Sequence, residues 1–155
     1  MQRRTLLSGL ALSSLAAMTG CNAPPDQVKS DVALIANGLS GVIAALPAGT
    51  VPSNTVAQAQ NIINDIRSDA ASISQAITAN PDTVQAISTL VSALAALLTP
   101  FFPVAPLAAA AIKAALALLP VVLAAVGRPP AAATAAPTMT PAEARAVLSS
   151  SATAK

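Results

Sequence analysis

The chain of 155 residues contains no histidine, no tryptophan and no tyrosine, and it has a single cysteine. Without histidine, the Ser–His–Asp and Cys–His arrangements of nucleophilic catalysis cannot be built, and neither can a zinc site of the usual His and Cys type. The sequence also lacks a glycine-rich loop of the kind that cradles phosphates. We therefore expect no catalytic residue, no metal site and no cofactor, and a protein that is not an enzyme.

Charged side chains are also scarce, at 9% of the residues against the ~25% of an average protein. Two of the eight basic residues, Arg3 and Arg4, lie at the extreme N-terminus, and the remaining six balance the six acidic residues. Phe101 and Phe102 are the only aromatic residues on which bases could stack. A neutral chain without a basic patch is not expected to bind nucleic acid.

The first twenty residues have the pattern of a secretory signal peptide. Arg3 and Arg4 give a basic start, a mostly apolar stretch follows from Leu6 to Met18, and small residues precede Cys21. The apolar stretch is too short to cross the ~30 Å hydrocarbon core of a bilayer as a helix. We therefore predict a signal peptide over residues 1–20 and export of the remainder.

Met18-Thr19-Gly20-Cys21 resembles the lipobox of bacterial lipoprotein precursors, in which an apolar residue, a small residue and Gly or Ala precede the modified cysteine. Met18 stands where leucine is usual. The resemblance implies diacylglycerol on the sulfur of Cys21, cleavage before it, and a fatty acyl group such as palmitate on the new amine. Residues 21–25 would then be a lipidated tether to the membrane. The alternative is an ordinary signal peptidase that cuts after Ala23.

Two further resemblances concern the export route and the destination. The segment Gln2-Arg3-Arg4-Thr5-Leu6-Leu7 is similar to a twin-arginine export motif, although two arginines also suit an ordinary signal peptide. Asn22 follows the cysteine, and by resemblance to enteric lipoproteins the absence of Asp there favours the outer membrane. We expect a lipid-anchored protein of the cell membrane or outer membrane whose domain faces the periplasm or the exterior.

Three successive segments carry apolar residues at the spacing of amphipathic helices. Asp26, Thr55 with Gln58, and Asp82 with Gln85 are suitable helix starts, and Pro47 and Pro81 are suitable ends. Gly38 and Gly41 would let a neighbouring backbone come close to the first helix. The predicted buried stripes are Val28, Val32, Ile35, Leu39, Val42 and Leu46; Val56, Ala59, Ile63, Ile66, Ala70, Ile73 and Ile77; and Val84, Ile87, Val91, Leu94 and Leu98.

No charge interrupts the sequence between Ile87 and Ile112, but prolines at 100, 103 and 106 should break any helix there. We predict a stiff corner followed by a fourth helix from Pro106 to Gly127. Phe101 and Phe102 lie in this corner, and on an extended backbone two adjacent rings cannot point the same way. They are the candidate contact tip of the protein, or one of them closes the core.

The predicted fold is all-α: a small four-helix bundle of antiparallel amphipathic helices over residues 26–127, followed by a disordered Pro/Ala-rich linker and tail over residues 128–155. Within the tail, Thr140 and Pro141 could start a short helix that runs to Leu148. Asp65 and Asp69 lie one helical turn apart, which indicates a solvated face rather than a metal site.

These observations favour a membrane-anchored envelope lipoprotein with a structural or interaction role, held to the membrane by lipid on Cys21. Two alternatives remain open. Residues 88–127 could be inserted in the bilayer, at a cost of ~2.5–3.5 kcal/mol for the charge of Lys113. The helices could also form a cleft that carries an apolar ligand. The protein partner and the oligomeric state are not indicated by the sequence.

Overall fold

The structure is a computed structural model, and it describes residues 25–128 and 139–153. This part of the chain is all-helical and contains no strand, which confirms that the fold is all-α. The predicted signal peptide, Cys21 and the proline-rich segment 129–138 lie outside the described residues. The helices are α1 (Pro25–Ala44), α2 (Ser53–Gln75), α3 (Pro81–Leu98), the 3-10 helix η1 (Thr99–Phe101), α4 (Pro106–Ala125) and α5 (Pro141–Thr153).

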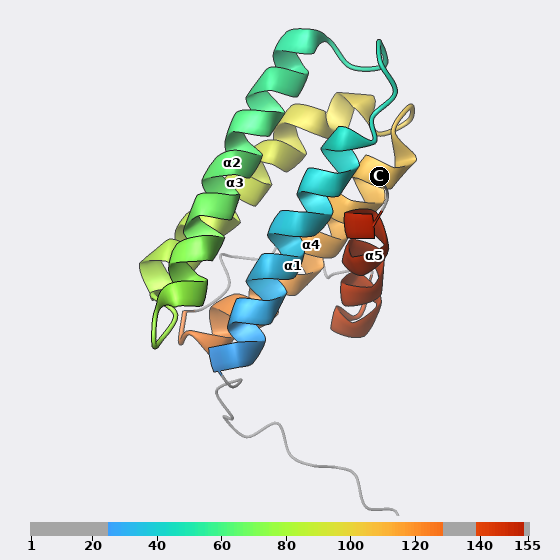
Figure 1. The fold of residues 1–155 in the computed structure, drawn as a ribbon. Coiled ribbons are helices and arrows are strands. Elements are labelled where there is room, and N and C mark those ends of the chain that lie inside the picture. Colours follow the sequence, from blue (N-terminus) through green and yellow to red (C-terminus); the bar gives the residue numbers. More distant parts are fainter. Residues whose placement is uncertain (1–24, 129–138, 154–155) are drawn as a thin grey trace, which may run out of the picture.

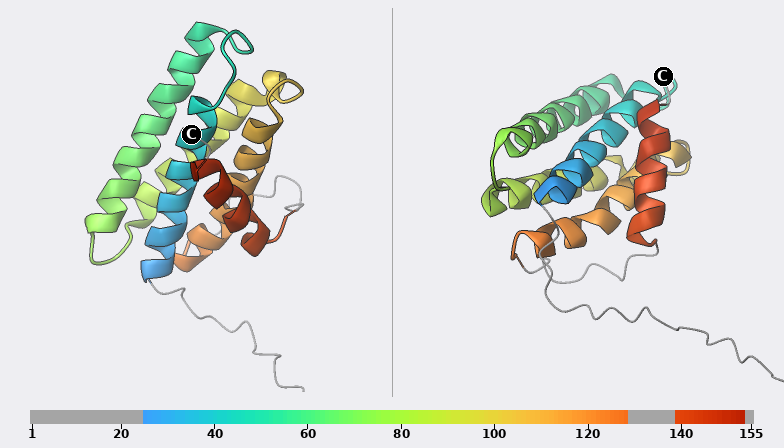
Figure 2. Two further views of the ribbon diagram at one scale, coloured as in Figure 1. Left: turned by 45° about the vertical axis from the view of Figure 1, so that its right-hand side comes forward. Right: turned by 60° about the horizontal axis from the view of Figure 1, so that its bottom comes forward.

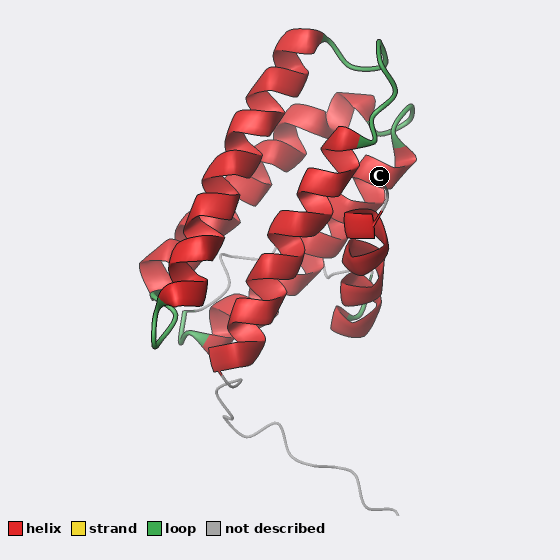
Figure 3. Ribbon diagram, in the orientation of Figure 1, coloured by secondary structure: helices red, strands yellow, loops and turns green. Residues whose placement is uncertain are grey.

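The helices surround a single apolar core (Figures 1 and 2). Each of the first four helices packs against the next one along the chain, and α4 also contacts α1, which closes the ring. The fifth helix lies across α1 and α4 on the outside of this ring. Loops occupy the two ends of the molecule (Figure 3). The helix α4 is therefore covered by α1, α3 and α5 together.

The predicted apolar stripes form the core, apart from the two ends of the second stripe and the end of the first. All five stripe residues of α3 are at most 2% exposed. Val56 and Leu46 are only partly buried. Ile77 was predicted to continue the α2 stripe, and this is wrong: α2 ends at Gln75, and the side chain of Ile77 is 92% exposed in the following turn.

The starts of two helices differ from the prediction. Thr55 and Gln58 do not form a capping box, because α2 begins two residues earlier, at Ser53, with Pro52 in the capping position. The third helix is capped by Asn80, whose side-chain oxygen accepts a hydrogen bond of 2.9 Å from the backbone N–H of Asp82. Pro81 takes the first helical position, where its missing N–H costs nothing.

The largest departure from the prediction is α5, which lies within residues assigned to a disordered tail. Thr140 caps this helix as predicted, and Glu143 completes a capping box by accepting hydrogen bonds from the Thr140 N–H (2.8 Å) and hydroxyl (2.7 Å). The helix continues to Thr153 because Ala144 and Leu148, both fully buried, add their side chains to the core. A 13-residue helix that would be marginal alone is stabilised here by packing.

Candidate functional site

The α3–α4 corner, residues 100–107, is a continuous apolar surface segment. A turn was predicted here, and the backbone does turn, through η1: the N–H groups of Val104 and Ala105 both bond the carbonyl oxygen of Phe101, at 3.1 and 3.0 Å. On this helical turn Phe101 and Phe102 are both half-buried and both pack against the core. Adjacent rings are forced to point apart only on an extended backbone, and this segment is not extended.

The exposed apolar side chains of the corner are Val104 and Leu107, which are 56% and 65% exposed. Prolines 100, 103 and 106 between and beside them are exposed too, and only Ala105 is buried. The aromatic pair was predicted as the contact tip and Val104 and Leu107 were not, because the spacing of these two residues is indistinguishable from that of core residues. The corner thus offers a stiff apolar surface whose outermost groups are aliphatic.

A buried ion pair joins the two ends of the described chain. The carboxylate of Asp31 on α1 accepts two hydrogen bonds of 2.7 Å from the guanidinium of Arg145 on α5, and a third of 3.1 Å from the Gln27 amide. The Asp31 side chain is 3% exposed and that of Arg145 is 34% exposed. The hydrogen bonds to Asp31 raise the pKa of Arg145 above its ordinary value. The pair fixes the position of α5 along α1.

Two glycines of α1 let α5 approach closely, as their occurrence in the sequence indicated. A Cβ atom on Gly38 would lie 2.7 Å from Leu148 Cδ2 and 3.1 Å from the Leu148 carbonyl oxygen. A Cβ atom on Gly41 would overlap the backbone carbonyl of Ser151. The contact therefore needs glycine at position 41, because the backbone of α5 lies where a larger side chain would be. At position 38 a Cβ atom would mainly displace the Leu148 side chain.

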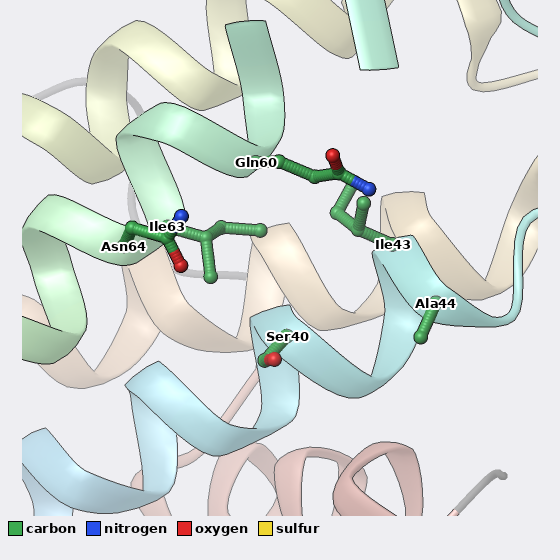
Figure 4. A pocket seen from close by; sticks show the side chains of 6 residues that line it. All are labelled: Ser40, Ile43, Ala44, Gln60, Ile63 and Asn64. Atoms are coloured by element: carbon green, nitrogen blue, oxygen red, sulfur yellow. The ribbon is translucent and has the colours of Figure 1, made fainter. Parts of the chain in front are cut away.

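A pocket of about 240 Å³ lies between α1 and α2, and Figure 4 shows the side chains that line it. Ile43 and Ile63 provide apolar surface, while Ser40, Gln60 and Asn64 provide uncharged polar groups. A carrier of an apolar ligand needs a concave and mostly apolar cavity that covers most of the ligand. This hollow is open and half polar, so it does not have that form.

A second groove, of about 500 Å³, runs between α2 and α3 and contains Asp65 and Asp69. Partial burial raises the pKa of Asp69, and the charge of Asp65 adds to this effect. Across the groove lie Thr89 and Leu90. Among the residues that the structure describes, no group of three or more acidic or cysteine side chains could hold a metal ion.

Two helical segments are long and apolar enough to cross a membrane by length and composition: Pro81–Phe101 and Pro106–Ala125. In the structure their apolar faces meet other helices. All the stripe residues of α3 are buried, and α4 is covered on most of its surface. Core helices of a soluble protein meet the same criteria of length and composition, so the two segments are weak indications of a membrane span.

Three of the predicted functional residues, the lipid-attachment residue Cys21 and the export arginines Arg3 and Arg4, lie outside the described residues. The first described helix, α1, begins four residues after Cys21. The corner with Phe101 and Phe102 follows the C-terminal end of α3. No known family, curated protein or solved structure matches this chain.

Proposed function

We propose that this protein is an exported lipoprotein of the bacterial envelope, anchored by lipid on Cys21, whose helical domain acts as an interaction module rather than an enzyme. The anchor is proposed on the lipobox-like Met18-Thr19-Gly20-Cys21. The observation that carries the interaction role is the stiff apolar corner at residues 100–107, with Val104 and Leu107 exposed beside two core-packed phenylalanines. Contiguous exposed apolar surface is a common mark of protein contact sites. The corner would therefore be the surface presented to a protein partner.

The proposed arrangement of the module is an antiparallel four-helix bundle formed by α1 to α4, with α5 as a fifth helix laid across it. Short connections support it, since residues 45–52, 76–80 and 99–105 join consecutive helices that pack together. In this arrangement the chain reverses at every connection (Figure 1). The corner then lies at the end of the bundle opposite the start of α1.

A stiff corner suits a contact role for an energetic reason. The prolines at 100, 103 and 106 restrict the backbone, and the hydrogen bonds to the Phe101 carbonyl hold the turn. Phe101 and Phe102 support it from the core side. Little conformational entropy is then lost when Val104 and Leu107 become buried by a partner, so more of the apolar contact energy contributes to affinity.

The alternative that residues 88–127 insert in the bilayer draws on the same two apolar helices. It requires α4 to exchange its present neighbours for lipid, and Lys113, which is exposed in the structure, to enter the hydrocarbon. A version of the chain that begins at Pro24 separates the two ideas. If the domain is an interaction module, we expect this truncated chain to be helical and monodisperse in sedimentation without detergent. If residues 88–127 insert in the bilayer, the truncated chain should require detergent.

The contact role is tested with a photo-crosslinking amino acid placed at Val104 or Leu107 and, as a matched control, at Leu116, which is 36% exposed on α4. Irradiation of host cells should give one discrete adduct from the two corner positions and none from position 116. Equal labelling from all three positions, or none from any, would contradict the proposed contact surface.

A further inference from the structure

We infer that the end of the bundle where α1 begins is a membrane-contacting face, on which Ile77 inserts into the interface of a phospholipid bilayer. This inference rests on the proposed lipidation of Cys21 and adds a second, non-covalent attachment to it. It also sets the orientation of the domain, because the α3–α4 corner then points away from the membrane.

The turn that carries Ile77 lies beside the first turns of α1. The ammonium group of Lys29 donates a hydrogen bond of 2.5 Å to the carbonyl oxygen of Ala76, the residue before Ile77. The turn ends at Asn80, which caps α3. The turn between α2 and α3 is thus fixed relative to the start of α1, and both lie at the lower end of the molecule in Figure 1.

The last turn of α4 reaches the same end of the molecule. Gly127, in the left-handed conformation (φ +76°), ends the helix, and the Arg128 N–H bonds the Leu123 carbonyl oxygen at 2.9 Å. The guanidinium of Arg128 forms an ion pair with Asp82 in the first turn of α3. We call the surface made by Pro25, Asp26, Lys29, Ile77, Asp82 and Arg128 the tether end.

The exposure of Ile77 is not accounted for by the fold. At 92% it is the most exposed of the large apolar side chains that the structure describes. One exposed apolar side chain is ordinary on a protein surface. The position of Ile77 is the relevant feature. It lies in a turn held by the hydrogen bond from Lys29, at the end of the domain that is nearest in sequence to the proposed lipid on Cys21.

The length of the tether keeps this end of the domain close to the bilayer once Cys21 is lipidated. Cys21 precedes Pro25 by four residues, and four residues of fully extended chain span at most about 14 Å. The start of α1 therefore cannot move further than this from the lipid headgroups. The 18 residues of α3, at 1.5 Å of rise per residue, place the corner about 27 Å from the tether end.

The charges on the tether end indicate which kind of bilayer contact is expected. Asp26 and Asp82 oppose Lys29 and Arg128, so the face carries both signs equally. Anionic lipid would not be attracted to it strongly. The contact should therefore depend on the apolar side chain of Ile77 and be similar on neutral and anionic membranes.

Tryptophan fluorescence can test this contact. Because the sequence has no tryptophan and no tyrosine, a single introduced tryptophan is the main source of fluorescence. Full-length protein is produced in a bacterial host as Ile77→Trp and, separately, as Leu107→Trp, and is reconstituted in phosphatidylcholine vesicles with and without brominated chains. We expect bromine to quench the tryptophan emission of the Ile77→Trp variant and to leave that of the Leu107→Trp variant unchanged. Adding phosphatidylglycerol should change neither result.

A second pair of variants measures the strength of the contact. Ile77→Ser should raise the rate at which the lipidated protein transfers between vesicles by about tenfold, because the buried apolar side chain is lost. Leu107→Ser is the matched control and should leave the rate unchanged. Circular dichroism of all four variants verifies that the helical content is retained.

Three results would overturn the inference: quenching at position 107 instead of 77, quenching at both positions, or quenching at neither. Intact-mass measurement of the same preparations separates these results from a failure of the proposed function. A mass without lipid at Cys21 refutes the proposed anchoring, and with it the inference. A lipidated Cys21 in an Ile77→Trp variant whose emission is not quenched refutes the inference alone.

Discussion

Asp31 and Arg145 are 114 positions apart in the sequence and form a bidentate ion pair with two hydrogen bonds of 2.7 Å. This pair and the two glycines of α1 fix the docking of α5 on the bundle. Arg145→Ala should lower the free energy of unfolding by about 1–3 kcal/mol, because the buried Asp31 carboxylate would keep only the Gln27 amide as a partner. Urea denaturation measures this difference.

The double variant Asp31→Ala with Arg145→Ala provides the control. If the cost of Arg145→Ala comes from an unpaired buried charge, removing Asp31 as well should recover part of the lost stability. Strictly additive losses in the two single variants and the double variant would show that the ion pair does not couple α1 to α5.

Gly41→Ala should detach α5 from α1, since the new Cβ would overlap the Ser151 carbonyl group. Detachment should expose the peptide bond after Arg145, so limited trypsin digestion should cut there faster than in the unmodified protein. Asn37→Ala, on an exposed position of the same helix, is the control and should leave the cleavage rate unchanged. Equal rates for all three proteins would contradict the close approach.

Leu148→Ala tests how much the fifth helix contributes to stability. Leu148 is fully buried, so its truncation should cost about 2–5 kcal/mol. Leu107→Ala removes the same atoms from a 65% exposed side chain and should change stability by less than about 0.5 kcal/mol. Thermal denaturation of both variants makes the comparison, and similar melting temperatures would mean that residues 141–153 are not part of the cooperative unit.

Variants of the α3–α4 corner distinguish residues that stabilise the fold from residues that contact the proposed partner. Phe101→Ala and Phe102→Ala should each lower the melting temperature, because both rings pack against the core. Val104→Ser should leave the melting temperature unchanged and abolish the cross-linked adduct obtained from position 107. If instead one phenylalanine variant keeps its full stability, that ring belongs to the contact surface.

Asp69 gives a prediction on pH. Its pKa is raised by partial burial and by Asp65, so the folded state holds the proton more tightly than the unfolded chain does. The stabilising contribution of this group is present at low pH and is lost as the pH rises through the raised pKa. Asp69→Asn should therefore be more stable than the unmodified protein at neutral pH, and the difference should shrink in acid. Melting curves at several pH values decide this, and a constant difference would refute it.

The local features that the sequence predicted correctly are those set by periodicity. The stripes of α1 and α3, apart from Leu46 at the end of the first, are buried because a helix with one apolar face must cover it. Periodicity continued past the end of α2, however, and so placed Ile77 in the core. The helix ends two residues earlier, and no residue before Asn80-Pro81 marks that end in the sequence.

The features that could not be predicted depend on contacts between distant segments. The segment 140–148 looks weakly helical alone, and packing against both α1 and α4 stabilises α5. On α1 this contact involves Asp31, Gly38 and Gly41. The exposure of Val104 and Leu107 likewise depends on how the corner turns. Gly38 and Gly41 did indicate that some backbone would come close, but not which one.

The central claim is the lipid anchor at Cys21, and intact-mass measurement of protein extracted from its host membrane tests it most directly. We predict a mature chain that begins at Cys21 and carries diacylglycerol, with or without an acyl group on the amine, and a Cys21→Ser variant that leaves the membrane fraction. A mature chain that begins at Pro24 and carries no lipid would contradict the account.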